Sequence, residues 1–539
     1  MNFILLNVIQ VVYSILSVYL ILLSKHVIDA ATAGVFWELK RYGIQLVVIS
    51  LTEIALRAIL ASIDAVTRAK LEMHFKQEVL DTILKRNYEK ITKFHSGELM
   101  TRIVSDVNVI IDTLVTLIPN VLSMLTKLIC AVILLFQISR EFVMILLGGG
   151  VILFVVMNCF RPYLKRIHKK MQEAGSNVRL FFQEVFENLM VIKVFQAEDA
   201  ISKKAMDLQE TRYDIQMKRR SLTIASGTGL NIIFQVSYLY ALLWSAYHLY
   251  LGNITVGGLT SIVQLISQIQ TPIIGLSKSF QNVFAMFGSA ERIMELEQIE
   301  ADEMEEEINR DVLYQSLKAI VVKEIGFTYK NKRIFKTANL RIEKGEIVAI
   351  YGESGIGKST LLKLILGMIQ KDTGEIYFAL ENGKQQEIGI ETRNMFTYVP
   401  QGKFILSGSI RENITFVNPE VSEEQLEEAL QVSDCQKFIE DLPDGLETRI
   451  GERGKGLSEG QLQRIALARA MVSQAPILIL DEITSSLDSK TEEKVLNNIK
   501  NLQNRTCLIV THRNTISSIC DREFVVENQN IREKEKNNE

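Results

Sequence analysis

The sequence predicts a membrane protein of two parts, in which a helical bundle with six membrane spans precedes an α/β domain. Of the 539 residues, 47% are hydrophobic although 23% are charged, and residues 1–24 and 221–277 contain no Asp, Glu, Lys or Arg. Because a helix needs about 20 apolar residues to cross a bilayer, the first stretch is long enough for one span and the second for two. After residue 312 the pattern changes to short β-branched runs that alternate with amphipathic segments, which is typical of an α/β domain.

Six apolar segments are predicted to be spans: residues 2–24, 43–66, 113–139, 141–160, 222–250 and 256–277. The loops after the second and fourth carry 21 Lys and Arg residues, against 4 in the other loops. The positive-inside rule therefore predicts that the long loops and both termini face the cytoplasm. We expect the membrane to be a bacterial plasma membrane. The first stretch lacks a basic leader and a small-residue cleavage pattern, so we expect a span that is retained. The first predicted span begins directly after Met1, so we expect either a compact chain or a start codon that is misassigned.

An acid-rich segment separates the two parts. Residues 295–311 contain nine acids and one arginine, and such a run is typical of a solvated linker. We expect a membrane domain over residues 1–300, a linker over 301–312 and an α/β domain over 313–539. Within the last, residues 346–352, 475–482 and 507–512 are apolar runs with little alternation, which predicts parallel strands buried on both faces.

Composition also excludes some classes of protein. The net charge of −3 argues against a nucleic-acid partner. The five cysteines are scattered without metal-ligand spacing, so we expect reduced residues that contribute to packing.

Residues 352–359 form a phosphate-binding loop of the pattern G-x-x-x-x-G-K-[ST], with a strand-like run before it and a helix-like run after it. Glycines in such a loop allow backbone N–H groups to surround phosphate oxygens, while the lysine reaches the β- and γ-phosphates. The expected nucleotide contacts lie at Gly352, Ser354, Gly355, Gly357, Lys358, Ser359 and Thr360.

A magnesium-bound nucleotide also needs a carboxylate at the end of a neighbouring strand. Asp481 and Glu482 follow the apolar run ILIL, so we expect Asp481 and the Ser359 hydroxyl to hold Mg²⁺ and Glu482 to deprotonate or orient water.

Further motifs follow in a fixed order: Tyr329, the phosphate loop, Gln401 in YVPQ, LSEGQ at 457–461, Asp481-Glu482, SSLD at 485–488 and His512. With six preceding spans, the chain resembles a half-transporter of the ATP-binding cassette exporter family, which works as a dimer. The segments at 94–107, 186–199 and 284–296 also resemble the cytoplasmic segments of that family.

The resemblance implies a role for each matching residue. Tyr329 would stack on adenine, Gln401 would sense the γ-phosphate and contact Mg²⁺, and His512 would act in catalysis with Glu482 and Lys358. Ser458, Gly460 and Gln461 of the signature would serve the partner subunit's ATP. Asp488 would bridge the two cassettes, with a helix cap as the alternative.

The family signature is LSGGQ, and this chain has Glu459 at its third position. Residues 458–461 have the form S-x-x-Q, which predicts a capping box, and an acid in a first helical turn interacts favourably with the helix dipole. We therefore expect Glu459 to point away from phosphate and the site to stay competent.

Ionisable residues inside spans are costly and mark candidate functional positions. Glu53 and Arg57 are four residues apart, and we favour a self-neutralising pair over contact with cargo. For Lys127 two alternatives stay open: its side chain faces a water-filled cavity, or it pairs with Glu53 across helices.

These observations together predict ATP-driven export of an amphiphilic drug, lipid or peptide by a dimer in the lipid bilayer, with ATP and Mg²⁺ as cofactors. A homodimer is favoured, with a second half-transporter as the alternative. Two further alternatives remain: a membrane-anchored ATP sensor or channel regulator that moves no cargo, and a dedicated peptide or bacteriocin exporter.

Overall fold

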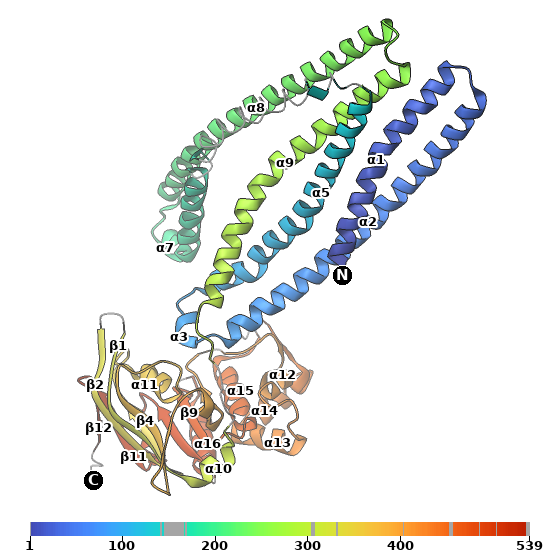
Figure 1. Cartoon of the computed structure of the whole chain (residues 1–539). Helices are drawn as coiled ribbons and strands as arrows, with labels where there is room; N and C mark the ends of the chain where they lie inside the picture. Colours follow the sequence, from blue (N-terminus) through green and yellow to red (C-terminus); the bar gives the residue numbers. More distant parts are fainter. Residues whose placement is uncertain are drawn as a thin grey trace. The chain divides into compact units, whose positions relative to one another are not determined.

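The computed structural model describes residues 2–138, 140, 143–144, 166–167, 170–302, 308–329, 332–402, 404–451, 456–484, 486–502 and 504–534. The chain forms two compact units: residues 1–80 with 97–295, and residues 81–96 with 296–539. The N-terminal unit is helical, whereas the C-terminal unit contains the strands (Figure 1).

Long helices make up the N-terminal unit because their sequences are apolar over most of their length. In chain order the elements of this unit, with the C-terminal end of α2 continuing beyond it, are α1 (Asn2–Thr32), α2 (Phe36–Lys85), α4 (Ser96–Thr101), the π-helix η1 (Arg102–Asp106), α5 (Val107–Ile138), α7 (Leu189–Val194), α8 (Glu198–Tyr250) and α9 (Val256–Glu297). Helices α1, α5 and α9 share a buried apolar cluster that includes Val18, Leu135 and Leu265.

Four helices among the described residues are long and apolar enough to cross a membrane: Asn2–Thr32, Phe36–Lys85, Ser96–Ile138 and Glu198–Tyr250. They confirm the first, second, third and fifth predicted spans. The fourth, 141–160, lies almost wholly outside the described residues. The sixth, 256–277, lies within α9, which is helical but is not among these four, so the number of six spans stays a prediction.

The C-terminal unit is built on two main sheets. Its elements are α3 (Tyr88–Ile91), α10 (Arg310–Ser316), β1 (Leu317–Tyr329), β2 (Lys332–Glu343), β3 (Ile347–Tyr351), α11 (Lys358–Ile365), β4 (Thr373–Leu380), β5 (Gln385–Glu387), η2 (Ile390–Met395), β6 (Phe396–Val399), β7 (Gly408–Ser409), α12 (Ile410–Thr415), α13 (Glu423–Val432), α14 (Gln436–Glu440), η3 (Gly445–Glu447), β8 (Arg449–Ile450), α15 (Glu459–Val472), β9 (Ile477–Asp481), α16 (Ser489–Lys500), β10 (Thr506–Val510), η5 (Asn514–Ser518), β11 (Arg522–Glu527) and β12 (Asn530–Glu533).

In the described residues, one sheet has the order β2-β1-β4-β5 and is antiparallel, and the other has the order β12-β11-β3-β10-β9-β6. In the second sheet, β11, β3, β10, β9 and β6 are mutually parallel. Strands β3, β9 and β10 are buried along their whole length. The three strands predicted from apolar runs are therefore confirmed.

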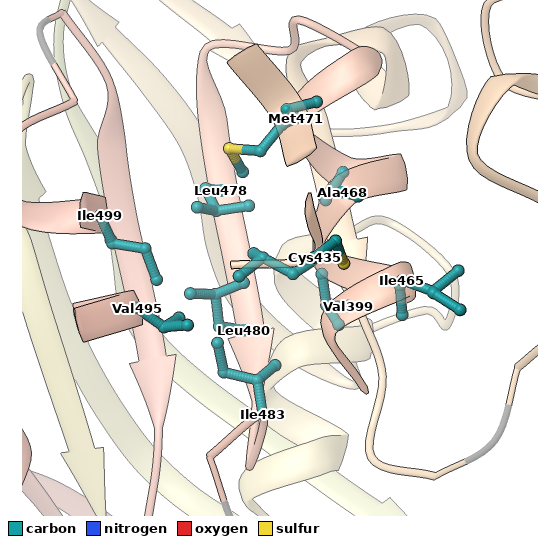
Figure 2. Close-up of a cluster of buried hydrophobic side chains, with 14 of the residues drawn as sticks. Val399, Cys435, Ile465, Ala468, Met471, Leu478, Leu480, Ile483, Val495 and Ile499 are labelled. Carbon is teal, nitrogen blue, oxygen red and sulfur yellow. The ribbon is translucent and has the colours of Figure 1, made fainter. Parts of the chain in front are cut away.

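Two apolar clusters cover the two faces of the parallel sheet. One joins it to α11 and to the antiparallel sheet, and the other joins it to α12–α16. Figure 2 shows Leu478 and Leu480 of β9 between Met471 of α15 and Val495 of α16. The parallel strands are thus fixed from both sides, and so are the loops at their carboxyl ends.

The unit boundary differs from the predicted one. Residues 81–96 belong to the C-terminal unit, where the Glu89 carboxylate accepts a hydrogen bond from the Gln370 backbone N–H at 3.3 Å. Asp302, predicted to be in a solvated linker, is half-buried and forms a 2.8 Å ion pair with Arg393. Asp302 thus has a charged partner within the C-terminal unit, while residues 303–307 of the predicted linker lie outside the described residues.

The cysteines among the described residues confirm the prediction that they are reduced and contribute to packing. Cys435, Cys507 and Cys520 are buried free thiols, and Cys130 is a half-buried one. Cys159 lies outside the described residues.

Candidate nucleotide-binding and hydrolysis site

The phosphate loop connects β3 to α11, as the sequence predicts. Gly355 has φ +77° and Gly357 has φ +120°, values that side-chain-bearing residues rarely adopt. A Cβ on Gly357 would also lie 2.4 Å from Cγ2 of Ile334. The backbone of the loop can therefore close at the N-terminus of α11, where N–H groups and the helix dipole favour a phosphate. Ser354 is exposed and Thr360 is half-buried in the first turn of the helix.

Lys358, the first residue of α11, points back along this loop. Its ammonium donates to the backbone oxygens of Gly352 at 2.6 Å and Glu353 at 3.1 Å, and its Nζ is 2.9 Å from Nε2 of His512. Burial lowers the pKa of Lys358, and the charges of Glu482 and Asp481 oppose that shift. The lysine is thus preorganised beside the predicted catalytic residues.

Ser359 and Asp481 meet in the way a magnesium site requires. The Ser359 hydroxyl donates to Oδ2 of Asp481 at 3.3 Å, which places two hard oxygen ligands together. Among the described residues there is no metal-binding cluster of three or more His, Cys, Asp or Glu. A carboxylate beside a hydroxyl suits Mg²⁺, which is held by one or two carboxylates together with phosphates and water. These residues fit the ion, which when bound would neutralise phosphate charge.

Tyr398 contacts the same carboxylate and was missed by the sequence analysis. It lies in β6, three residues before Gln401, and its hydroxyl donates to Oδ2 of Asp481 at 3.2 Å. Burial and the charge of Asp481 raise the pKa of Tyr398, so its phenol stays protonated as a donor. Burial also raises the pKa of Asp481, which Tyr398 and Ser359 partly offset.

Glu482 lies at the centre of the predicted catalytic residues. Its backbone has φ +53° and its N–H donates to the Val510 oxygen at 2.9 Å, which ties the end of β9 to β10. One carboxylate oxygen accepts from Gln401 Nε2 at 2.5 Å and the other lies 2.8 Å from His512 Nε2. Two residues that are far apart in the sequence, Gln401 and His512, therefore contact a single carboxylate from its two oxygens.

The imidazole of His512 has two mutually exclusive bonding patterns. Its Nε2 is close to both Lys358 and Glu482, and this nitrogen can either accept a hydrogen bond from the lysine or donate one to the carboxylate. The tautomer of His512 thus selects which of the two neighbours it holds.

Gln401 is placed beside Glu482, while the other magnesium candidates, Ser359 and Asp481, bond to each other. Tyr329 is the last residue of β1 and is 55% exposed, so its ring is accessible for stacking.

The signature residues form the start of α15. Ser458 Oγ accepts from the Gln461 N–H at 3.3 Å, and the Gln461 side chain accepts from the Ser458 N–H at 2.8 Å. The predicted capping box is confirmed, and Glu459 is an exposed residue of the first helical turn.

Gly460 is a buried residue of this turn, and a Cβ there would lie 2.8 Å from the Ser486 oxygen. Gln463 accepts from the Ser486 N–H at 3.3 Å. Asp488 caps α16 by accepting from the Thr491 N–H at 3.1 Å, which confirms its helix-cap alternative. The signature helix and the SSLD segment are thus packed together, a contact that the sequence analysis missed.

A second candidate site lies within the N-terminal unit. A cavity of about 420 Å³ between α1, α2 and α5 is lined by apolar and polar side chains: Leu6, Gln10, Tyr13, Arg57, Leu60, Ala61, Asp64, Arg68, Val115, Thr116, Pro119 and Asn120.

Arg57 donates to the Tyr13 hydroxyl at 2.7 Å, and Lys127 lies 5.8 Å from the centre of the Tyr13 ring. Among the described residues no ion pair within 4.0 Å joins Arg57 or Lys127 to Glu53. The predicted Glu53–Arg57 pair is therefore not a direct ion pair, because the Arg57 guanidinium donates to the Tyr13 hydroxyl instead.

Comparison with known proteins agrees with this arrangement. The family described as ABC transporter transmembrane region matches residues 1–273, and the family described as ABC transporter matches residues 335–485. The chain belongs to the ABC transporter family. This ABC transporter carries its transmembrane region and its ATP-binding cassette in one chain, and it is an ATP-hydrolysing integral membrane transporter.

Two relatives and one solved structure illustrate the likeness. The chain is 28% identical to ABC transporter B family member 1 of Dictyostelium discoideum over 85% of its own length, and it spans 50% of that protein. It is 28% identical to the multidrug resistance-like ATP-binding protein MdlA of Buchnera aphidicola, over 86% of this chain and 80% of that one. A bacterial Atm1-family ABC exporter with ATP bound has the same fold, with a TM-score of 0.81, 19% identity and coverage of 98% and 93%.

Proposed function

We propose that this ABC transporter exports an amphiphilic substrate and that hydrolysis of MgATP at the site around Glu482 drives the transport. The observation that carries the proposal is the position of Glu482, whose carboxylate contacts Gln401 and His512 beside Lys358 and the Ser359–Asp481 pair. An ATP sensor needs only binding, whereas a carboxylate held next to a histidine suits repeated activation of water.

The residues divide the work by their chemistry. The loop from Gly352 to Thr360 would bind the phosphates, with Lys358 reaching the β- and γ-phosphates once it leaves the backbone oxygens that it now contacts. Glu482 would accept the proton of the attacking water, and His512 would orient this carboxylate. Tyr329 would stack on adenine. Ser359 and Asp481 would hold Mg²⁺. Gln401, which now contacts the Glu482 carboxylate, would be a further magnesium ligand.

A dimer is part of the proposal. Ser458 and Gln461 bond to each other at the start of α15, and the phosphate loop is at the start of α11. We propose that ATP bound at the phosphate loop of one chain also contacts the signature residues of a partner chain. The partner is either a second copy of this chain or a different half-transporter. Both parts are present in one chain, which favours the homodimer, and the mass of the purified transporter in lipid nanodiscs tests it.

The cavity in the N-terminal unit supports the proposed substrate class. Its lining combines apolar side chains such as Leu60 and Val115 with Arg57, Arg68 and Asp64. Arg68 is paired with both Asp64 and Asp112, so most of the charge is balanced. Such a surface suits amphiphilic drugs, lipids or peptides. Both termini would face the cytoplasm.

Transport into inside-out vesicles tests export directly. We expect ATP-dependent accumulation of an amphiphilic probe, and we expect Glu482→Gln to lower ATP turnover by about 10²- to 10⁴-fold, the usual contribution of a general base. ATP binding should persist in this variant. Full turnover by Glu482→Gln would refute the assignment of the base, and turnover without accumulation of any peptide, lipid or hydrophobic cation would favour the sensor or regulator.

A further inference from the structure

Tyr398 is the one described side chain, besides Ser359, that bonds to the Asp481 carboxylate. The Asp481 residue is 3% exposed at the carboxyl end of β9, and both donors address its Oδ2 atom, Tyr398 at 3.2 Å and Ser359 at 3.3 Å. Two hydrogen bonds to one oxygen fix the rotation of a carboxylate. Among the described residues the other oxygen, Oδ1, is left for further ligands.

The two donors are not equivalent. Ser359 is itself a candidate magnesium ligand, so its hydroxyl oxygen has a second use when nucleotide is bound. The phenol of Tyr398 comes from β6, the strand next to β9, where Tyr398 is paired in register with Ile479. Its ring is half-buried and packs against the cluster between the two sheets. Tyr398 therefore holds Asp481 from a rigid part of the fold.

We propose that Tyr398 is a positioning residue for magnesium, which acts by orienting the Asp481 carboxylate. The proposal rests on the function proposed above, in which Asp481 holds the ion of MgATP. Carboxylates that bind metals are usually oriented by a second hydrogen bond, and loss of such a partner typically weakens metal binding about 10- to 100-fold.

Tyr398→Phe removes the hydroxyl and leaves the ring in place. Tyr314→Phe is a matched control, because Tyr314 is buried and its hydroxyl bonds to the hydroxyl of Thr506 at the same 3.2 Å, away from the site. Both variants are made in full-length protein that also carries Glu482→Gln, so that bound ATP is not consumed.

Binding of Mn²⁺ with the protein in excess over ATP, so that little free nucleotide competes for the ion, is measured from the free-ion signal in electron paramagnetic resonance and gives the metal affinity without turnover. We expect the Kd for Mn²⁺ to rise about tenfold or more in Tyr398→Phe and to be unchanged in Tyr314→Phe. ATP binding in EDTA should change less than twofold in both. In protein with native Glu482, Tyr398→Phe should raise the Mg²⁺ concentration for half-maximal turnover more than it lowers kcat.

An unchanged Kd for Mn²⁺ in Tyr398→Phe would overturn the inference and leave the proposed function intact. An equal loss of metal-free ATP binding would also overturn it, since the tyrosine would then support the site as a whole. If the parent protein bound no Mn²⁺ with ATP, the magnesium assignment itself would fail and the inference with it.

Discussion

Nε2 of His512 lies 2.8 Å from the carboxylate of Glu482, at the ends of two adjacent parallel strands, β10 and β9. The histidine is 42% exposed and the glutamate 16%, so solvent reaches the pair from the histidine side. This geometry makes the histidine a support for the carboxylate that is proposed to activate water.

We expect His512→Ala to lower kcat of ATP hydrolysis about 10²-fold or more with little change in ATP affinity, because the carboxylate loses its orienting contact. His512→Gln keeps a side-chain N–H that can donate to Glu482 and should retain more activity than the alanine variant. Phosphate release and equilibrium ATP binding measure the two quantities. Equal activity of both variants would show that a hydrogen bond at this position is not what matters.

Glu459 is expected to be neutral for turnover. It is exposed in the first turn of α15, where an acid stabilises a helix by about 0.3–1 kcal/mol. Glu459→Gly should change the rate of ATP hydrolysis less than tenfold, which is about 1.4 kcal/mol of barrier, and should lower the melting temperature slightly. A gain of more than tenfold would identify the glutamate as inhibitory.

Gly460 is expected to be intolerant of even one methyl group. A Cβ at this position would meet the Ser486 backbone oxygen at 2.8 Å and Leu487 Cδ2 at 3.2 Å, and neither the backbone nor the packed leucine can move freely. We expect Gly460→Ala to destabilise the cassette by about 1–3 kcal/mol, as overpacking does. Gly97→Ala, where a Cβ meets nothing within 4 Å, is the control. Similar melting temperatures for the two variants would contradict this account.

A buried charge cluster links α9 to the π-helical turn before α5. Asp106, whose side chain is 4% exposed, accepts from Arg292 Nε at 2.9 Å and from the Ser289 hydroxyl at 2.8 Å. Arg102, 2% exposed, donates to the Arg292 backbone oxygen at 2.6 Å and to Glu295, which is 55% exposed.

We therefore expect an asymmetric response to mutation in this cluster. Arg292→Ala leaves a buried carboxylate without its main partner and should cost about 3–5 kcal/mol. Glu295→Ala removes an exposed partner of Arg102, which keeps Glu98 as a second carboxylate partner at 2.7 Å, and should cost about 0–1 kcal/mol. Denaturant titration in detergent micelles compares them, and equal losses would show that burial of Asp106 does not control the stability of this cluster.

Local sequence patterns predict a structural feature correctly where the interactions that form it lie within a few residues of one another. The phosphate loop between strand and helix and the capping box of Ser458 and Gln461 follow from spacing alone, and the structure has both. Contacts between strands that are distant in the chain could not be predicted from such patterns. Tyr398 stands in YVPQ, but nothing in that motif indicates that β6 lies beside β9 and that the phenol reaches Asp481.

The predicted Glu53–Arg57 pair does not form directly, because a neighbouring helix offers another partner. Spacing of four residues suggested that Glu53 neutralises Arg57, whereas Tyr13 of α1 accepts the hydrogen bond of the guanidinium. Likewise Asp302 was grouped with its acidic neighbours, although Arg393 lies within 2.8 Å of it. In both cases the partner comes from another part of the chain, which the pattern of a single segment does not describe.

The chain enters the C-terminal unit twice, first with residues 81–96 and then from residue 296 onward. Cleavage of the backbone between residues 302 and 308 would therefore not be enough to release the cassette as a free fragment. The upstream piece would keep Glu89 and Asp302, and the downstream piece would keep their partners, Gln370 and Arg393. A nicked protein should thus migrate as two bands under denaturing conditions and as one particle under native ones.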